Sequence, residues 1–220
     1  MSEKSLYYIK QPYIFPQFVF NFYFCSQMRY AIKEDIQHIS NEELSRALSL
    51  LPDWRREKAL RFKYSLGQVE CAFSYLMLCD LLKEEYGINS QPHFLIGEHG
   101  KPTLQEHPEI HFNISHCKNA IAVAVSTEPI GIDVESIGRG NESLMNYVLN
   151  EEEIRQVKST DAPPVAFIQL WTRKEALFKL LATGITDDIK GLLTRHPDIS
   201  IDTQTNTEKG YALSIAQYSK

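Results

Sequence analysis

Two acidic residues stand two positions apart in GIDVESI, residues 131–137. Apolar residues alternate with Asp133 and Glu135, as in a β-strand with one buried face, so both carboxylates point to the other face. Their Cα atoms are then roughly 6.5–7 Å apart, which lets two carboxylates that would otherwise repel each other share one small cation. Mg²⁺ fits, because it binds one or two carboxylates together with waters and substrate phosphates. For the pair alone, the alternative is the solvated face of an edge strand.

A third acid lies in WTRKEALFKL, residues 171–180. Glu175 and Lys179 are four residues apart and share one face of a predicted helix, with Trp171 one turn earlier on nearly the same stripe. Such a pair is most often an ordinary surface ion pair. Trp171 and Phe178 argue against free exposure, however, and indicate that the pair lies at the rim of a site.

Ser115 and His116 end a predicted strand in FNISHCKNA, residues 112–120. Neighbouring residues of a strand point in opposite directions, so the two do not form a hydrolase dyad, and the sequence has no G-x-S-x-G motif. A hydroxyl, an imidazole and turn amides can instead hold a phosphate. The alternative is a capped turn.

A basic run interleaved with apolar residues covers positions 54–63, and Lys101 follows in the glycine-rich GEHGKPTL. Arg55 and Lys58 are three residues apart and share a helix face, from which they can meet a polyanionic ligand. The alternative is an exposed amphipathic helix. The cations of the run are Arg55, Arg56, Lys58, Arg61 and Lys63.

Helices and strands must position these residues. Ser40 followed by Glu43 is a capping-box signature, Asp53 is expected to cap the next helix, and Gly87 to end a long buried one. The helices are predicted over 41–51, 53–65, 68–87, 151–158 and 165–184, with a break at 163–164. The strands are predicted over 110–117, 120–126 and 128–137, as an antiparallel meander, and over 199–217, as two strands around a turn near 209–210.

The fold class is therefore α+β, with antiparallel sheets and packed helices. The change of pattern near residue 127 predicts two halves, 1–127 and 128–220. The first contains the basic helix, the long buried helix and strands. The second contains the acidic strand, the W-x-x-K-E helix and the C-terminal strands.

Composition limits the classes of function that the protein can have. The 220-residue chain has a net charge of −5, which gives no argument for nucleic acid. Its four cysteines have no zinc-ligand spacing, which favours a reducing, cytoplasmic compartment. The aromatic stretch 7–30 is interrupted by prolines and is too short for a membrane span, so we expect strands or a buried loop of a soluble protein.

In this order, the motifs resemble the 4′-phosphopantetheinyl transferase family, of the Sfp (surfactin-synthetase-activating) type rather than the short trimeric holo-acyl-carrier-protein synthases. A basic helix, GKP, FNISH, GIDVE and WTRKEALFK follow one another between about Pro52 and Gly191. The spacing of about 40 residues between G-x-D-x-E and W-x-x-K-E-x-x-x-K makes the resemblance specific.

The resemblance implies a pseudo-dimer of two similar α+β halves with the active site between them. It implies Mg²⁺-dependent transfer of 4′-phosphopantetheine from coenzyme A, the co-substrate, to a serine of an apo acyl, peptidyl or polyketide carrier protein, releasing 3′,5′-ADP. Because one chain supplies both halves, we expect a monomer that needs neither nucleic acid nor membrane.

The resemblance also assigns roles to residues at matching positions. Glu175, directly or through a metal-bound water, is the candidate base, and Lys179 faces the charge that develops on the leaving 3′,5′-ADP. Two departures affect the nucleotide side: Arg55 replaces a common lysine, and Gln68–Glu70 stand where a basic residue is frequent. The metal ligands are Asp133, Glu135 and Glu175, the nucleotide side has Arg55, Lys58, Lys101, Ser115 and His116, and Lys174 and Lys179 flank the diphosphate.

Two alternatives remain open at this point. One is a non-catalytic module that binds coenzyme A or a carrier protein on the same fold. The other is a Mg²⁺-dependent phosphohydrolase that uses the same acids.

Overall fold

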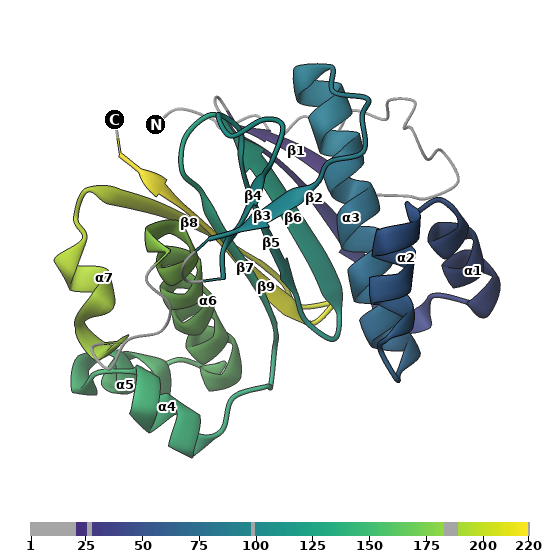
Figure 1. The fold of residues 1–220 in the computed structure, drawn as a ribbon. Coiled ribbons are helices and arrows are strands. Elements are labelled where there is room, and N and C mark those ends of the chain that lie inside the picture. The colour runs from purple at the N-terminus through teal and green to yellow at the C-terminus, as the bar shows by residue number, and fades with distance from the viewer. Residues whose placement is uncertain (1–20, 26–27, 98–99, 183–188, 220) are drawn as a thin grey trace.

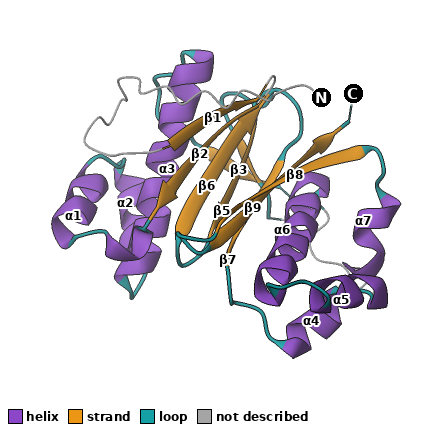
Figure 2. Cartoon of the chain, turned by 180° about the vertical axis from the view of Figure 1, so that it is seen from behind, coloured by secondary structure: helices purple, strands orange, loops and turns teal. Residues whose placement is uncertain are grey.

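Four layers build the protein in a computed structural model, which describes residues 21–25, 28–97, 100–182 and 189–219. The strands lie in the middle, with α1–α3 on one side and α4–α7 on the other (Figures 1 and 2). Two antiparallel sheets pack face to face, and each carries a long helix on its outer face. The predicted α+β class is confirmed, with two similar halves.

The N-terminal sheet has the strand order β1-β2-β6-β5 and is covered by α3. The strand β6 is buried along its whole length, as its apolar sequence predicts. The elements are β1 (Asn21–Cys25), β2 (Met28–Glu34), the 3₁₀ turn η1 (Ile36–His38), α1 (Asn41–Ser49), α2 (Asp53–Leu60), α3 (Ser65–Tyr86), the small hairpin β3 (Phe94–Ile96) and β4 (Pro102–Leu104), β5 (His111–His116) and β6 (Ala120–Ser126).

The C-terminal sheet has the order β7-β9-β8 and is covered by α6. Its last two strands form the hairpin predicted for the tail. The elements are β7 (Gly131–Ser136), α4 (Glu142–Val148), α5 (Glu151–Lys158), α6 (Pro163–Leu181), η2 (Ile189–Gly191), α7 (Leu192–Arg195), β8 (Ile199–Asn206) and β9 (Tyr211–Tyr218). The division of the chain at 127/128 stays a prediction.

The predicted three-stranded meander is wrong in its third member. The strand β6 pairs with β5 and β2, so both its edges are occupied, and β7 pairs with β9 instead. The strands β7 and β5 still lie side by side, one from each sheet. Strand alternation then sends Ile132 and Val134 into the core between the sheets, while Asp133 and Glu135 face the other way.

The predicted helix ends were partly right. Ser40 caps α1 by accepting from the Glu43 amide at 3.1 Å, and Gly87 ends α3 in the left-handed region at φ 67°. Asp53 is not a cap: it is the first residue of α2 and pairs with Arg56. The pair of prolines begins α6 rather than separating it from α5, because proline is well tolerated in the first turn. The helix α4 was not predicted, and Gly184 lies outside the described residues.

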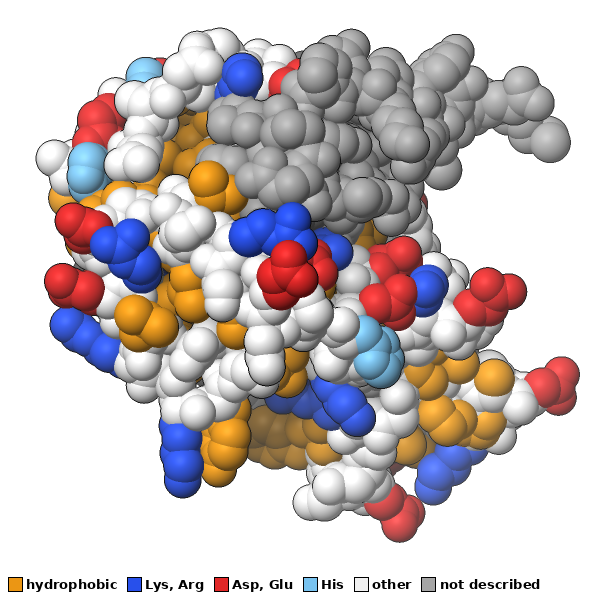
Figure 3. Space-filling view, turned by 90° about the vertical axis from the view of Figure 1, so that its right-hand side faces the viewer, with side chains coloured by type: hydrophobic (Ala, Val, Ile, Leu, Met, Phe, Trp, Pro, Cys, Tyr) orange, Lys and Arg blue, Asp and Glu red, His pale blue; other side chains and the backbone are white. Residues whose placement is uncertain are grey.

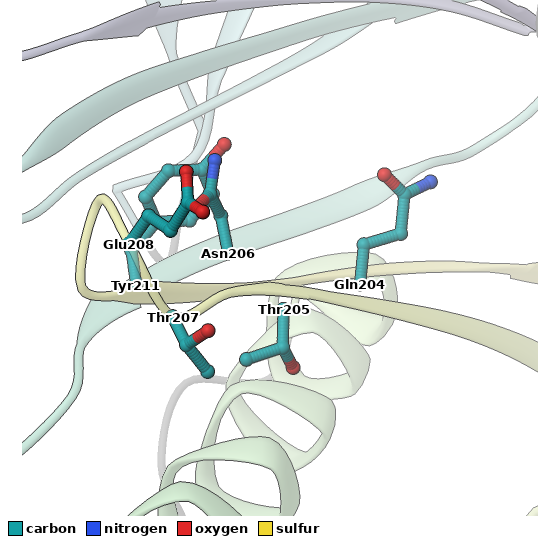
Figure 4. Close-up of a pocket in the computed structure, with 6 residues that line it drawn as sticks. All are labelled: Gln204, Thr205, Asn206, Thr207, Glu208 and Tyr211. Atoms are coloured by element: carbon teal, nitrogen blue, oxygen red, sulfur yellow. The ribbon is translucent and has the colours of Figure 1, made fainter.

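The β8–β9 hairpin connects the two halves, through residues of which Gln204, Asn206 and Tyr211 are drawn in Figure 4. Glu34 accepts from the Tyr211 hydroxyl at 2.7 Å and from the Asn206 amide at 3.0 Å, and Gln204 donates to the Tyr30 hydroxyl at 2.8 Å. A polar cavity of about 360 Å³ lies against this hairpin. Gln204, Asn206 and Tyr211, which line it, are the residues that bond to the N-terminal sheet, so the cavity belongs to this contact between the halves.

Of the described helices, none is long and apolar enough to cross a membrane.

Candidate active site at the seam

A glycine lets α6 approach β7 closely. A Cβ atom at Gly131 would lie 2.0 Å from the Ala176 carbonyl oxygen and 2.5 Å from the Leu180 amide nitrogen. Any side chain there would push the helix away from the strand. This close approach brings Glu175 and Lys179 of α6 over the acidic face of β7.

Asp133 is the buried centre of the site, with 3% of its surface exposed. Its Oδ1 accepts from the Ser115 hydroxyl and from the Lys179 ammonium, both at 2.8 Å. Its Oδ2 has no hydrogen-bond partner among the described residues. A buried carboxylate oxygen without a donor is costly, and a bound cation would remove that cost.

Side chains of β5 join the two sheets where the backbone ladder stops. The Ser115 hydroxyl accepts from the Val134 amide at 3.2 Å, and the Asn113 side-chain oxygen accepts from the Ile132 amide at 2.9 Å. Lys179 also donates to the Ser115 hydroxyl, at 2.8 Å. Ser115 therefore fixes the register of Asp133 against the N-terminal half.

Glu135 is held by two donors. Its two carboxylate oxygens accept from the Arg139 guanidinium, and one of them accepts weakly from the Trp171 indole at 3.4 Å. Burial raises the pKa of Glu135, and the charge of Asp133 adds to the increase. Trp171 is itself buried beside this acid, as expected of a residue that argued against free exposure of this face of α6.

Glu175 is the most perturbed acid of the site. Burial, followed by the negative charge of Asp133, raises its pKa to about 7, although Lys179 acts in the opposite direction. Asp133 and Glu135 both contribute to this increase, so the three carboxylates share one electrostatic environment. Such mutual repulsion favours a cation between them.

These donors fit a hard divalent cation in their chemistry. Carboxylate oxygens are what Mg²⁺ binds, and the Asp133 Oδ2 atom is available. As the side chains stand, however, no three His, Cys, Asp or Glu residues of the described chain are grouped closely enough to hold a metal ion. Lys179 and Arg139 occupy two of the acids as internal counter-ions. A metal would therefore have to displace at least one of these ion pairs.

An open cavity of about 500 Å³ adjoins Arg139, between the β5–β6 turn and the β7–α4 loop. Lys118 contributes a second cation to it. Cys117 also lines it, but burial raises the pKa of this thiol, so it is not an activated nucleophile. None of the three acids lines the cavity, and Arg139, which binds Glu135, connects it to the site.

The basic residues predicted for the nucleotide side are placed differently from one another. Arg55 is buried: its guanidinium donates to the Cys71 carbonyl at 2.9 Å and lies against the Tyr75 and Phe94 rings, and burial lowers its pKa. Lys58 is exposed on α2. The structure therefore does not bring Arg55 to the seam.

Lys101 and His116 lie closer to the seam. The Lys101 ammonium donates to the Lys179 carbonyl at 2.6 Å and to the Ile130 carbonyl at 3.3 Å, so it ties the N-terminal half to α6 and to the start of β7. His116 is exposed at the end of β5, with its Nδ1 atom 3.3 Å from Glu70 on α3. Glu70 is one of the residues that stand where a basic residue was expected.

Lys174 lies apart from the acids of the seam, with none of its surface exposed. Its ammonium donates to Glu153 and to the Val148 carbonyl, both at 2.7 Å, and to the Lys190 carbonyl at 3.3 Å. An ammonium closed into the protein in this way cannot flank a diphosphate. Lys174 is therefore not part of the candidate site.

Sequence reasoning missed Arg139 and Asn113. Arg139 follows β7 in a loop and carries no motif, and Asn113 shows its role only once β5 and β7 lie together. One signal was available for Asn113: apolar residues alternate with it along the strand, which places Asn113 on the same face as Ser115.

Comparison with known proteins identifies relatives. Residues 129–218 match the model of the 4′-phosphopantetheinyl transferase superfamily. The chain is 27% identical over 151 residues to the 4′-phosphopantetheinyl transferase Sfp of Bacillus subtilis (strain 168), an alignment that covers 67% of each chain. It is 28% identical over 163 residues to another Bacillus subtilis 4′-phosphopantetheinyl transferase, covering 73% of each. It is 38% identical over 93 residues to AcpT of Salmonella typhi, covering 40% of this chain and 48% of AcpT.

Proposed function

We propose that the chain transfers 4′-phosphopantetheine from coenzyme A to a serine of an apo carrier protein, on the premise that residues 129–218 match the model of the 4′-phosphopantetheinyl transferase superfamily. The reaction would release 3′,5′-ADP and would require Mg²⁺. The carrier is an acyl, peptidyl or polyketide carrier protein. The active site would form at the seam between the two halves of one chain, so a monomer is sufficient.

One observation carries the proposal: a buried acid pair on β7 meets Glu175 and Lys179 of α6 at the seam, and one Asp133 oxygen has no donor among the described residues. Asp133, Glu135 and Glu175 would hold the Mg²⁺ ion. When bound, the ion would neutralise the diphosphate of coenzyme A and so ease the approach of a serine oxygen.

Lys179 would act on the leaving group. Its ammonium already lies at the centre of the site, bound to Asp133 and Ser115, and 27% of its side chain is exposed. If a cation takes over Asp133, the ammonium is free to turn to the diphosphate, where negative charge develops on 3′,5′-ADP. Ser115 would keep Asp133 in place during this exchange.

Glu175 would take the proton of the acceptor serine. It would do so directly or through a metal-bound water, because a carboxylate that also binds the metal is a weaker base. On the nucleotide side we propose Lys58 and His116, both exposed. Arg55 and Lys101 would serve the scaffold, because their donors are engaged with backbone carbonyls.

The test is intact-mass spectrometry of apo acyl and peptidyl carrier proteins after incubation with the chain, coenzyme A and Mg²⁺. We expect each accepted carrier to gain the mass of one phosphopantetheine. If no carrier of a broad panel gains mass, the proposal fails. Release of free phosphopantetheine without carrier would instead identify a phosphohydrolase. Binding of coenzyme A that ignores Mg²⁺, with no turnover, would identify a binding module.

A reducing, cytoplasmic compartment is part of the proposal. Three described cysteines, Cys71, Cys79 and Cys117, are free thiols, which supports it.

A further inference from the structure

Apolar and basic side chains are exposed together where α2 ends and turns into α3. Eight large apolar side chains are exposed in the described part of the chain, and three of them, Leu60, Phe62 and Tyr64, fall within residues 60–64. Figure 3 faces this end of the molecule and shows apolar side chains beside Lys and Arg side chains in its lower part. Three of the eight exposed apolar side chains within five residues is a concentration that indicates a contact surface. We call Leu60, Arg61, Phe62, Lys63 and Tyr64 the basic–apolar rim.

The backbone of the rim and its Phe62 ring are held in place. The Phe62 amide donates to the Ala59 carbonyl at 3.1 Å, and the Gln68 side chain donates to the Phe62 carbonyl at 3.0 Å. The Phe62 ring lies on Gly67, where an added Cβ would be only 2.7 Å from it. A surface that is already ordered loses little entropy when a partner binds, so the rim is suited to docking.

The charges of the rim call for an acidic partner. Within the described chain, neither Arg61 nor Lys63 forms an ion pair, whereas Arg56 one turn earlier is paired with Asp53. The Lys63 ammonium lies 5.4 Å from the centre of the Tyr64 ring, and Tyr64 is 72% exposed. Cations without acids, around exposed aliphatic and aromatic groups, complement an acidic surface that also presents apolar side chains.

The rim borders the candidate site. Tyr64 immediately precedes α3, and Glu70 on this helix lies 3.3 Å from His116. His116 follows Ser115, which donates to Asp133. Six residues of helix span about 9 Å, so a folded protein that rests on the rim can reach the seam with a nearby loop.

We propose that the basic–apolar rim docks the carrier protein through an acidic surface that also presents apolar side chains. The inference rests on the proposed function, which requires a protein substrate at the seam. A nucleotide would use the cations of the rim but would leave Leu60 and Tyr64 without a role. A folded carrier protein would contact both the cations and the apolar side chains of the rim.

Two variants test the docking. The first, Leu60→Ser with Tyr64→Ser, removes the two most exposed apolar groups of the rim and spares Phe62. The second, Arg61→Glu with Lys63→Glu, reverses its charge. The probes are apo acyl and peptidyl carrier proteins whose acceptor serine is replaced by alanine, with the Kd measured by calorimetry. We expect each variant to raise the Kd, and the KM for unmodified carrier, about tenfold or more. The KM for coenzyme A should stay within about twofold.

Ile96→Ser is the matched control, because Ile96 is 68% exposed on β3, outside the rim. It should leave every constant unchanged. Rim variants that bind carrier as tightly as the wild type would overturn the docking inference. A wild-type dimer that both variants convert to monomer would also overturn it, because a second copy of the chain would then occupy the rim. Wild-type protein that binds the serine-free carrier but never transfers would overturn the proposed function alone.

Discussion

Two lysines of α6 lie in contrasting environments. Lys174 and Lys179 are five residues apart, which places them about 140° apart around the helix axis. Lys174 is closed into the C-terminal half, where each of its contacts is to a protein oxygen. Lys179 lies at the seam, where its partner Asp133 keeps one oxygen without a donor. The ammonium of the enclosed Lys174–Glu153 pair is bound by three protein oxygens. The Lys179–Asp133 pair keeps one carboxylate oxygen without a donor among the described residues, and a binding site requires such a free oxygen.

Removing the acid at the seam should have the largest effect. Asp133→Asn keeps the size of the side chain and its bond to Ser115 but removes the charge that a cation needs. We expect transfer to fall about 10³-fold or more, because charge stabilisation dominates phosphoryl transfer. The carrier mass-shift rate measures it. Asp202→Asn, an exposed acid on β8, is the control. Wild-type rates in the Asp133 variant would remove Asp133 from the site.

The enclosed lysine should matter for stability instead. Lys174→Ala leaves Glu153 buried without its cation, and we expect the free energy of unfolding to fall by roughly 3–5 kcal/mol. Lys179→Ala should cost less than Lys174→Ala, since 27% of the Lys179 side chain is exposed and Ser115 still donates to Asp133. Urea unfolding of both variants compares them. Equal losses would show that the two faces of α6 do not differ as described.

Gly131 tests how closely the two elements of the seam must pack. Gly131→Ala places a methyl group against the α6 backbone, and overpacking of this kind costs about 1–3 kcal/mol. Because the shift falls next to Ala176, it should also move Glu175 and lower the transfer rate. Gly87→Ala, at a helix end with open space around it, is the control: it should lose stability through its positive φ but keep its activity per folded molecule. A fully active Gly131 variant would show that the spacing is not critical.

The acidity of Glu175 should appear as a pH dependence of stability. In the folded protein its pKa is about 7, against an ordinary value of 4.5 when unfolded. The folded state therefore holds the proton more tightly, so this contribution to stability is full below pH 4.5 and is lost as the pH rises through 7. Glu175→Gln should flatten that part of the curve by roughly 1–2 kcal/mol, after allowance for solvent screening. Unfolding at pH 5 and pH 8 in the presence of a chelator measures it, and parallel curves would contradict the prediction.

Local patterns in the sequence predicted much of the fold. The apolar run of β6, the cap at Ser40 and the turn of the tail each depend on neighbours in the chain, so they can be read from it. The partner of β7 could not be read, because the choice between β6 and β9 depends on which strand edges are already occupied.

The candidate site divides in the same way. The spacing of Asp133 and Glu135 and the shared face of Glu175 and Lys179 are local, and the structure brings these residues together. Lys174 is buried because α5 packs against α6 and supplies Glu153, and this packing could not be predicted from the local sequence. Arg55 shows the same limit, since a cation within a basic run was expected to meet a ligand and instead lies against aromatic rings.

The smallest predicted effect concerns the second counter-ion of the seam. Arg139 binds both oxygens of Glu135 and therefore competes with any metal for that carboxylate. Arg139→Gln should lower the Kd for Mg²⁺ about three- to tenfold, because the acid is freed and a nearby positive charge is removed. Calorimetry without coenzyme A measures it. Arg155→Gln, which breaks an exposed pair with Glu152 on α5, is the matched control and should leave the Kd unchanged. Weaker Mg²⁺ binding in the Arg139 variant would mean that the guanidinium organises Glu135 for the metal instead of opposing it. The seam would then resemble the enclosed pair of Lys174, complete before any ligand arrives.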